Sequence, residues 1–114
     1  MNDFIAAEEQ PPVIEIKMVD GIFIKRMFIA KAGTFIPQHA HAYPHATFIA
    51  FGSVRIWKDG VLIGDYYAPK GLTIPANCKH LFQALEDGTT LDCIHNIGRR
   101  GVVEIAAEHH LVGG

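Results

Sequence analysis

Short runs of β-branched and aromatic residues, separated by Gly, Pro, Asp and Asn, follow one another from Val13 onward. Runs of this kind favour strands, and the residues between them mark turns. The pattern predicts strands at Val13–Val19, Ile22–Lys31, Thr34–Pro37, Ala46–Phe51, Ser53–Lys58, Val61–Tyr66, Leu72–Ile74, His80–Glu86, Thr89–His95 and Val102–Ala106.

Helical periodicity is weak throughout the chain. No stretch longer than about twelve residues keeps apolar positions three and four apart without a Gly or Pro. Only residues 105–111 would fit a helical turn. Asp59–Gly60 and Asp87–Gly88 each separate two β-rich runs and predict type I′ hairpin turns. Many short strands with little helix predict an all-β sandwich or closed barrel.

The length predicts one folded unit. With 114 residues, 49% of them hydrophobic, the chain can bury one core but not two. Residues 1–12 contain Pro11 and Pro12 and indicate an N-terminal arm, residues 13–108 the barrel, and residues 109–114 a C-terminal tail with His109 and His110.

Composition excludes several partners. Charged residues make up 19% and the net charge is -2, so no basic face is expected for nucleic acid. No apolar stretch approaches the roughly 20 residues that span a bilayer, which predicts a soluble protein without membrane contact. Cys78 and Cys93 provide neither a disulfide framework nor a thiolate zinc site, which favours a cytoplasmic location.

Four histidines carry the strongest chemical signal. His39, His41 and His45 fall within seven residues, and His80 follows a Pro-containing turn. On a strand His39 and His41 share a face, and His45 can rejoin it, although Pro44 makes the backbone there irregular. Four imidazoles inside an apolar barrel would be costly unless a cation satisfied them, so the pattern favours a metal site. The alternative is a set of surface or individually hydrogen-bonded histidines.

The same residues resemble the two motifs of the cupins. Gly33, five residues, His39-Ala-His41, three residues, His45, six residues and Gly52 keep the spacing of the first cupin motif, with His45 in place of its glutamate. Pro75-Ala76-Asn77 followed by two residues and His80 matches the centre of the second motif, whose outer Gly and Asn are Pro69 and Ala84 here. Asn77 stands for a glycine, and Asn tolerates positive φ best among the other residues.

This resemblance implies a double-stranded β-helix, or jelly-roll barrel, with a metal near one mouth, and frequently a homodimer. The implied ligands are His39, His41, His45 and His80. Imidazole at the glutamate position leaves a divalent ion its full charge, which favours an anionic oxygen ligand. We expect one divalent transition-metal ion, with iron preferred over manganese, nickel or zinc.

The predicted pocket is largely apolar and suits a small-molecule ligand. Thr47, Ile49 and Phe51 share the parity of His45, and Phe82 and Ala84 share that of His80. These residues would also suit an ordinary barrel core. Tyr43 and His95 are the candidate catalytic proton donors or bases, and Cys93 is either a neighbour of the pocket or an apolar filler.

Three functions remain open at this point. The first is an oxygenase-type enzyme, such as a dioxygenase, that uses the metal and dioxygen on a small organic substrate. The second is a non-redox isomerase or lyase, in which the ion polarises a carbonyl and Tyr43 or His95 moves a proton. The third is a small-molecule-binding protein without catalysis, because fold and metal do not determine activity.

Overall fold

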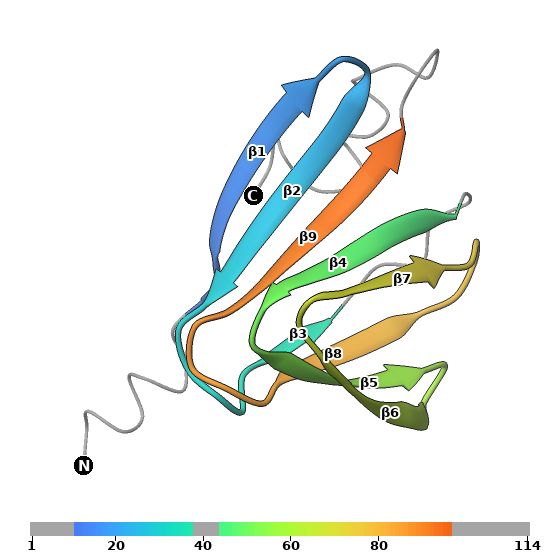
Figure 1. The fold of residues 1–114 in the computed structure, drawn as a ribbon. Coiled ribbons are helices and arrows are strands. Elements are labelled where there is room, and N and C mark those ends of the chain that lie inside the picture. The colour runs from blue at the N-terminus through green and yellow to red at the C-terminus, as the bar shows by residue number, and fades with distance from the viewer. Residues whose placement is uncertain (1–10, 38–43, 97–114) are drawn as a thin grey trace.

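A computed structural model describes residues 11–37 and 44–96 of the chain, and all of its regular structure is β-strand. The strands are β1 (Val13–Val19), β2 (Ile22–Ile29), β3 (Phe35–Pro37), β4 (His45–Phe51), β5 (Ser53–Lys58), β6 (Val61–Tyr67), β7 (Lys70–Ile74), β8 (His80–Ala84) and β9 (Thr89–Asn96) (Figure 1). Nine predicted strands are therefore confirmed, with ends within two residues of the prediction. The predicted strand Val102–Ala106, the helical turn at 105–111, the C-terminal tail and most of the N-terminal arm lie outside the described residues.

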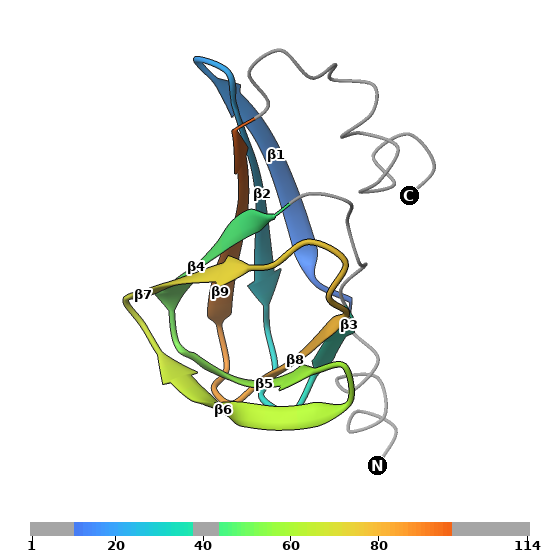
Figure 2. The ribbon, with the colours of Figure 1, turned by 90° about the vertical axis from the view of Figure 1, so that its right-hand side faces the viewer.

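The strands form two antiparallel sheets that face each other (Figure 2). The order is β1-β2-β9-β4-β7 in the five-stranded sheet and β3-β8-β5-β6 in the other. After the β1–β2 hairpin, every connection except that between β5 and β6 crosses from one sheet to the other. This crossing pattern is that of a jelly roll, which encloses one core between the sheets. Within the described residues, no helix is present that could cross a membrane.

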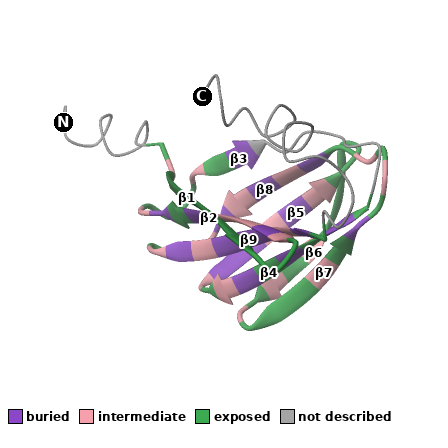
Figure 3. Ribbon diagram, turned by 90° about the horizontal axis from the view of Figure 1, so that it is seen from above, coloured by how far each residue is buried: buried purple, intermediate pink, exposed green. Residues whose placement is uncertain are grey.

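The core lies between the two sheets and follows the strand alternation. Buried positions form alternating bands along β9, β4, β8 and β5, whereas every residue of β1 is exposed (Figure 3). A period of two places one face of each strand on the core. The buried apolar cluster consists of Met27, Ile29, Ile36, Ile49, Val54, Ile56, Ile74, Phe82, Ala84, Leu91 and Cys93.

Of the two predicted type I′ turns, the one at Asp59–Gly60 is present. Asp59 and Gly60 have φ values of 49° and 85° between the paired Lys58 and Val61, which confirms the positive φ of a type I′ turn. Asp20 and Gly21, with φ values of 50° and 77°, form an equivalent turn between β1 and β2 that the sequence analysis did not single out.

The prediction of a hairpin at Asp87–Gly88 is wrong. Only Gly88 has positive φ, and the segment links β8 of one sheet to β9 of the other. The Asp87 carboxylate accepts a hydrogen bond from the Ala32 amide at 2.8 Å, and the Gly88 amide donates to the Ile29 carbonyl at 2.9 Å. Contacts with the β2–β3 connection, rather than a local turn, therefore fix this segment.

Phe51 also departs from its prediction. Its side chain is 60% exposed, whereas Thr47 and Ile49 are fully buried. The pairing of β4 with β9 shifts register between Ile49 and Phe51, and such a bulge reverses the face on which the next side chain lies. Phe51 consequently lies on the outer surface and does not line the interior.

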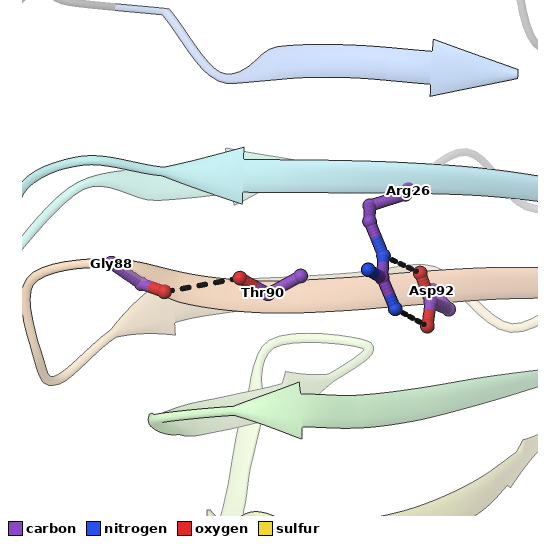
Figure 4. Close-up of polar contacts among 4 residues, drawn as sticks. All are labelled: Arg26, Gly88, Thr90 and Asp92. Atoms are coloured by element: carbon purple, nitrogen blue, oxygen red, sulfur yellow. Dashed lines mark hydrogen bonds and ion pairs between the residues drawn. The ribbon is translucent and has the colours of Figure 1, made fainter.

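An ion pair fixes the outer face of the five-stranded sheet. Arg26 on β2 and Asp92 on β9 are cross-strand partners, and the guanidinium donates two hydrogen bonds to the carboxylate (Figure 4). On the same strand as Asp92, the Thr90 hydroxyl donates to the Gly88 carbonyl at 3.1 Å (Figure 4). The Arg26–Asp92 pair joins β2 to β9, whereas the Thr90 contact is local to the start of β9.

Candidate functional site

A row of inward-facing residues crosses the five-stranded sheet. Phe23 on β2 is the register partner of His95 on β9, and His45 on β4 is the partner of Ile74 on β7. All four side chains are buried, with exposed fractions between 1% and 7%. This row places two histidines side by side on the inner wall of the barrel.

The rings of His45 and His95 stack on each other. Their centroids are 4.7 Å apart and their planes differ by 23°. On its other side, the His95 ring packs against Phe23 with a centroid separation of 5.6 Å. Because the His95 ring is held between two other rings, its position relative to His45 is well defined.

His80 reaches the interior from the opposite sheet. It begins β8, is 4% exposed, and its ring meets Phe82 edge-on at 6.3 Å. Its Nδ1 lies 3.4 Å from the Cys78 carbonyl oxygen, so a protonated Nδ1 would donate to it. That tautomer leaves Nε2 with a free lone pair, as in many metal-ligating histidines.

The connection before His80 is held by two features. Asn77 has a φ of 60°, as its place in the resemblance to the second cupin motif requires. The Lys79 amide donates to the Asp59 carboxylate at 3.1 Å, and the Asp59 amide donates to the Lys79 carbonyl at 2.8 Å. Together these contacts fix the backbone where the chain enters β8, and so fix the position from which the His80 side chain extends.

Of the predicted ligands, His45 and His80 lie on inner faces of the two sheets. The strands that they begin, β4 and β8, both start on the right-hand side of Figure 1, where β7 ends. His39 and His41, together with the candidate catalytic residue Tyr43, lie outside the described residues. Within residues 11–37 and 44–96, no three His, Cys, Asp or Glu side chains are grouped closely enough to hold a metal ion.

A second inward-facing row lies next to the first and contains Lys25 on β2, Cys93 on β9, Thr47 on β4 and Leu72 on β7. Burial lowers the pKa of the Lys25 ammonium, and the influence of Cys93 opposes this. Burial raises the pKa of the Cys93 thiol, and Lys25 and the Thr47 hydroxyl act in the opposite direction. The thiol therefore stays protonated at neutral pH.

Lys25 is the residue that the sequence analysis missed. Its neighbours two positions away, Phe23 and Met27, are 1% and 2% exposed, and the strand alternation places Lys25 on the same inner face. The signal was present as a single lysine between alternating apolar residues. Such a signal is weak, because a lone lysine is usually solvent-exposed.

Beyond these two rows the inner wall is mainly apolar, with Thr89 and the exposed Lys70 as polar exceptions, and the predicted lining residues Ile49, Phe82 and Ala84 are buried there. Met27, Ile49 and Leu91 continue the five-stranded sheet, and Phe82 and Ala84 are fully buried on β8. All three described buried histidines, His45, His80 and His95, lie toward the end of the barrel at which β4 and β8 begin, whereas the buried hydroxyls of Ser53 and Thr89 lie toward the other end.

Comparison with known proteins establishes the fold. No protein-family model and no curated protein matches the chain. Among solved structures, an RmlC-like cupin protein from Desulfovibrio desulfuricans has a TM-score of 0.64 and 23% identity, covering 77% of this chain and 85% of that one. A cupin superfamily protein from Desulfitobacterium hafniense has a TM-score of 0.62 and 18% identity, with coverage of 76% and 77%. KdgF from Halomonas sp. has a TM-score of 0.63 and 15% identity, with coverage of 75% and 80%.

These likenesses confirm the predicted fold class. The protein is an all-β double-stranded β-helix, and the structures that it resembles are cupin superfamily proteins. At such identities the likeness concerns the fold, and the chemistry has to be argued from the side chains of this chain.

Proposed function

We propose that this protein is a metal-dependent enzyme with a cupin fold that acts on a small organic substrate. One divalent ion would be held by His39, His41, His45 and His80, with iron preferred and manganese, nickel or zinc as alternatives. The observation that carries the proposal is the burial of His45 and His80 on inner faces of opposite sheets, on strands that begin at the same side of the molecule.

The donor chemistry of the two described histidines fits a divalent transition metal. Neutral imidazole is a suitable ligand for iron, manganese, nickel and zinc. The contact of His80 Nδ1 with the Cys78 carbonyl favours the tautomer in which Nε2 is free to ligate. When bound, such an ion supplies a positive charge that polarises a carbonyl oxygen of the substrate.

Proton transfer on the bound substrate, as in an isomerase or lyase, is the reaction that the geometry supports best. This chemistry needs an acid or base beside the metal ligands. His95 meets that requirement, because its ring stacks on the proposed ligand His45 at 4.7 Å and is held in place by Phe23. The role of His95 would be to accept or donate the proton at one of its ring nitrogens.

An oxygenase reaction is the second candidate. The observation that favours it is the apolar wall formed by Met27, Ile49, Leu91 and Phe82, which leaves few protein groups to take part in the reaction. In such a site the protein would position the substrate and exclude water, while the cofactor supplies the redox chemistry.

Metal titration tests the site itself. The metal-free protein would be titrated separately with Fe(II) under anaerobic conditions and with Mn(II), Ni(II) and Zn(II), and the bound metal measured. We expect one ion per chain in the wild type and at least about a tenfold loss of affinity in H45A and H80A. H109A is the matched control and should bind normally. Equal binding by all four proteins would contradict the proposed ligands.

Two activity measurements then separate the reactions. Exchange of substrate hydrogen for deuterium would be followed by NMR with hydroxyacetone and 2-oxobutyrate in deuterated water. Oxygen uptake would be followed with acetylacetone, cysteine and catechol. The H95F variant keeps an aromatic ring between Phe23 and His45 but removes both nitrogens. We expect it to keep the metal and to lose exchange by about 10²–10⁴-fold.

The alternative outcomes are distinct. Oxygen uptake without hydrogen exchange would replace proton transfer by the oxygenase reaction. An H95F protein with unchanged exchange would remove His95 from the mechanism. Metal binding with neither exchange nor oxygen uptake on any of these compounds would favour a small-molecule-binding protein without catalysis.

A further inference from the structure

Lys25 is a cationic side chain on the inner wall of the barrel. It lies opposite Cys93 across β2 and β9, and Cys93 is in turn opposite Thr47 across β9 and β4. Both Cys93 and Thr47 are fully buried, and Lys25 itself is only partly exposed. Lys25 therefore lies in the row next to His45 and His95, on the same face of the same sheet.

No carboxylate of the described residues forms an ion pair with Lys25. The ion pairs of the described residues join Arg26 to Asp92 and Arg55 to Asp65. The strand neighbours of Lys25 on its own face are the apolar Phe23 and Met27. A lysine that is partly removed from water without a counter-ion is costly, and an anion supplied by a ligand would offset that cost.

In the described strands, every carboxylate lies on the outer face of its sheet. Glu15 and Asp92 are in register with Arg26, which occupies the outer face of the five-stranded sheet. Asp65 on β6 pairs with Arg55, which alternates with the buried Val54 and Ile56. The described inner face of the five-stranded sheet thus bears two imidazoles, the partly buried amine of Lys25 and the exposed amine of Lys70. The described strands contribute no carboxylate to the interior.

We infer that Lys25 is the recognition group for a carboxylate of the ligand, so that the substrate is a small organic acid. The carboxylate would receive a charge-assisted hydrogen bond from the Lys25 ammonium, while another oxygen of the same molecule binds at the histidine end of the wall. This inference rests on the proposed function for the second contact. Lys70, also at an inward register position, is exposed at the far end of β7 and does not offer the same partly buried setting.

Two probes that differ only in their distal group test the contact. Succinate monohydroxamate and succinamide monohydroxamate carry the same metal-chelating end, but one ends in a carboxylate and the other in a carboxamide. Their affinities for the Ni(II)-loaded protein would be measured by calorimetry, together with those of the pair that is one methylene longer. We expect the wild type to prefer the carboxylate about tenfold in at least one pair.

The variants assign that preference to one residue. K25M replaces the amine by an apolar group of similar length and should reduce the preference to less than about twofold, without changing carboxamide affinity. K25R should keep most of the preference for the carboxylate probe. K17Q alters an exposed lysine of β1 and should leave it unchanged. A preference retained in K25M, or absent from the wild type in both pairs, would overturn the inference; thermal unfolding checks that each variant is folded.

A metal-free measurement keeps this inference separate from the metal site. Acetylation of Lys25 and Lys17 by an amine-acylating reagent would be followed by peptide mass spectrometry, with an excess of propionate or of propionamide. Propionate should slow acetylation of Lys25 at least about threefold and leave Lys17 unaffected. If neither hydroxamate binds the loaded wild type, the proposed metal site fails and the acetylation result alone decides. Equal acetylation of Lys25 in both solutions would then overturn the role of Lys25.

Discussion

Asp92 accepts both hydrogen bonds of a two-pronged contact from Arg26, at 2.7 Å from Nε and 2.8 Å from Nη2, yet the two side chains differ in exposure. The Arg26 side chain is 48% exposed and that of Asp92 only 9%. The guanidinium can therefore be hydrated when its partner is lost, whereas the carboxylate cannot.

The two single variants should accordingly differ in stability. R26A leaves a nearly buried carboxylate without its partner and should lower the free energy of unfolding by about 1–3 kcal/mol. D92A leaves a half-exposed arginine and should cost less than about 1 kcal/mol. Urea unfolding of both variants measures the difference. R55A, which breaks the more exposed pair with Asp65, is the control, and equal losses for R26A and D92A would contradict the argument.

Gly52 should tolerate no side chain. Its φ is 83°, and a Cβ built there would overlap the side chain and backbone of Thr89. G52A should lower the free energy of unfolding by about 3 kcal/mol or more, because backbone strain and steric overlap act together. Gly33 has a φ of 92° with open space around it, so G33A should cost only about 1 kcal/mol. Similar thermal shifts for the two variants would show that the contact with Thr89 is unimportant.

Cys93 should make the protein less stable as the pH rises into the alkaline range. Burial raises the pKa of its thiol above the ordinary value of 9.0, so the unfolded chain loses this proton at lower pH than the folded protein. The stability that depends on the protonated Cys93 thiol is fully present below about pH 9. Above that pH the free energy of unfolding falls by up to about 1.4 kcal/mol per pH unit.

The C93A variant isolates this effect, because Lys25 and the other basic groups remain in both proteins. Free energies of unfolding measured from pH 7 to pH 10.5 should fall more steeply for the wild type than for C93A above about pH 9. Parallel curves across the whole range would mean that the thiol ionises equally well in the folded and unfolded chain.

Asn77 should be replaceable by glycine but not by alanine. Its φ of 60° lies in the left-handed region, where glycine is unstrained and asparagine is tolerated. N77G should change the free energy of unfolding by less than about 0.5 kcal/mol, and N77A should lower it by about 1 kcal/mol. Chemical denaturation of the three proteins gives the comparison. If N77A were as stable as the wild type, this turn would not need the left-handed conformation.

Much of the fold could be predicted from the sequence because local rules determine it. Strand alternation located β1 to β9, and the short turn at Asp59–Gly60 has positive φ at both positions. The resemblance to the cupin motifs supplied the topology, which alternation cannot provide. The errors occurred where partners distant in sequence decide the outcome: Asp87 contacts Ala32, and the bulge before Phe51 depends on pairing with β9.

The candidate site was predictable in part for the same reason. The resemblance to the cupin motifs implied that His45 and His80 face the interior, and both are buried. No spacing rule indicates that His95, fifty residues after His45, stacks on it. That contact follows from the pairing of β4 with β9, which is a property of the folded sheet. The pairing of β2 with β9 likewise places Lys25 on the inner face of the five-stranded sheet.

The two polar rows lie at one end of the five-stranded sheet, and the apolar positions Met27, Ile49 and Leu91 continue it toward the other end. Under the proposed function, the groups that would contact the ligand and the residues that hold the sheets together lie on different stretches of the same strands. Substitutions at the polar positions should then change ligand preference with little effect on the fold. Such a division allows one architecture to serve many chemistries.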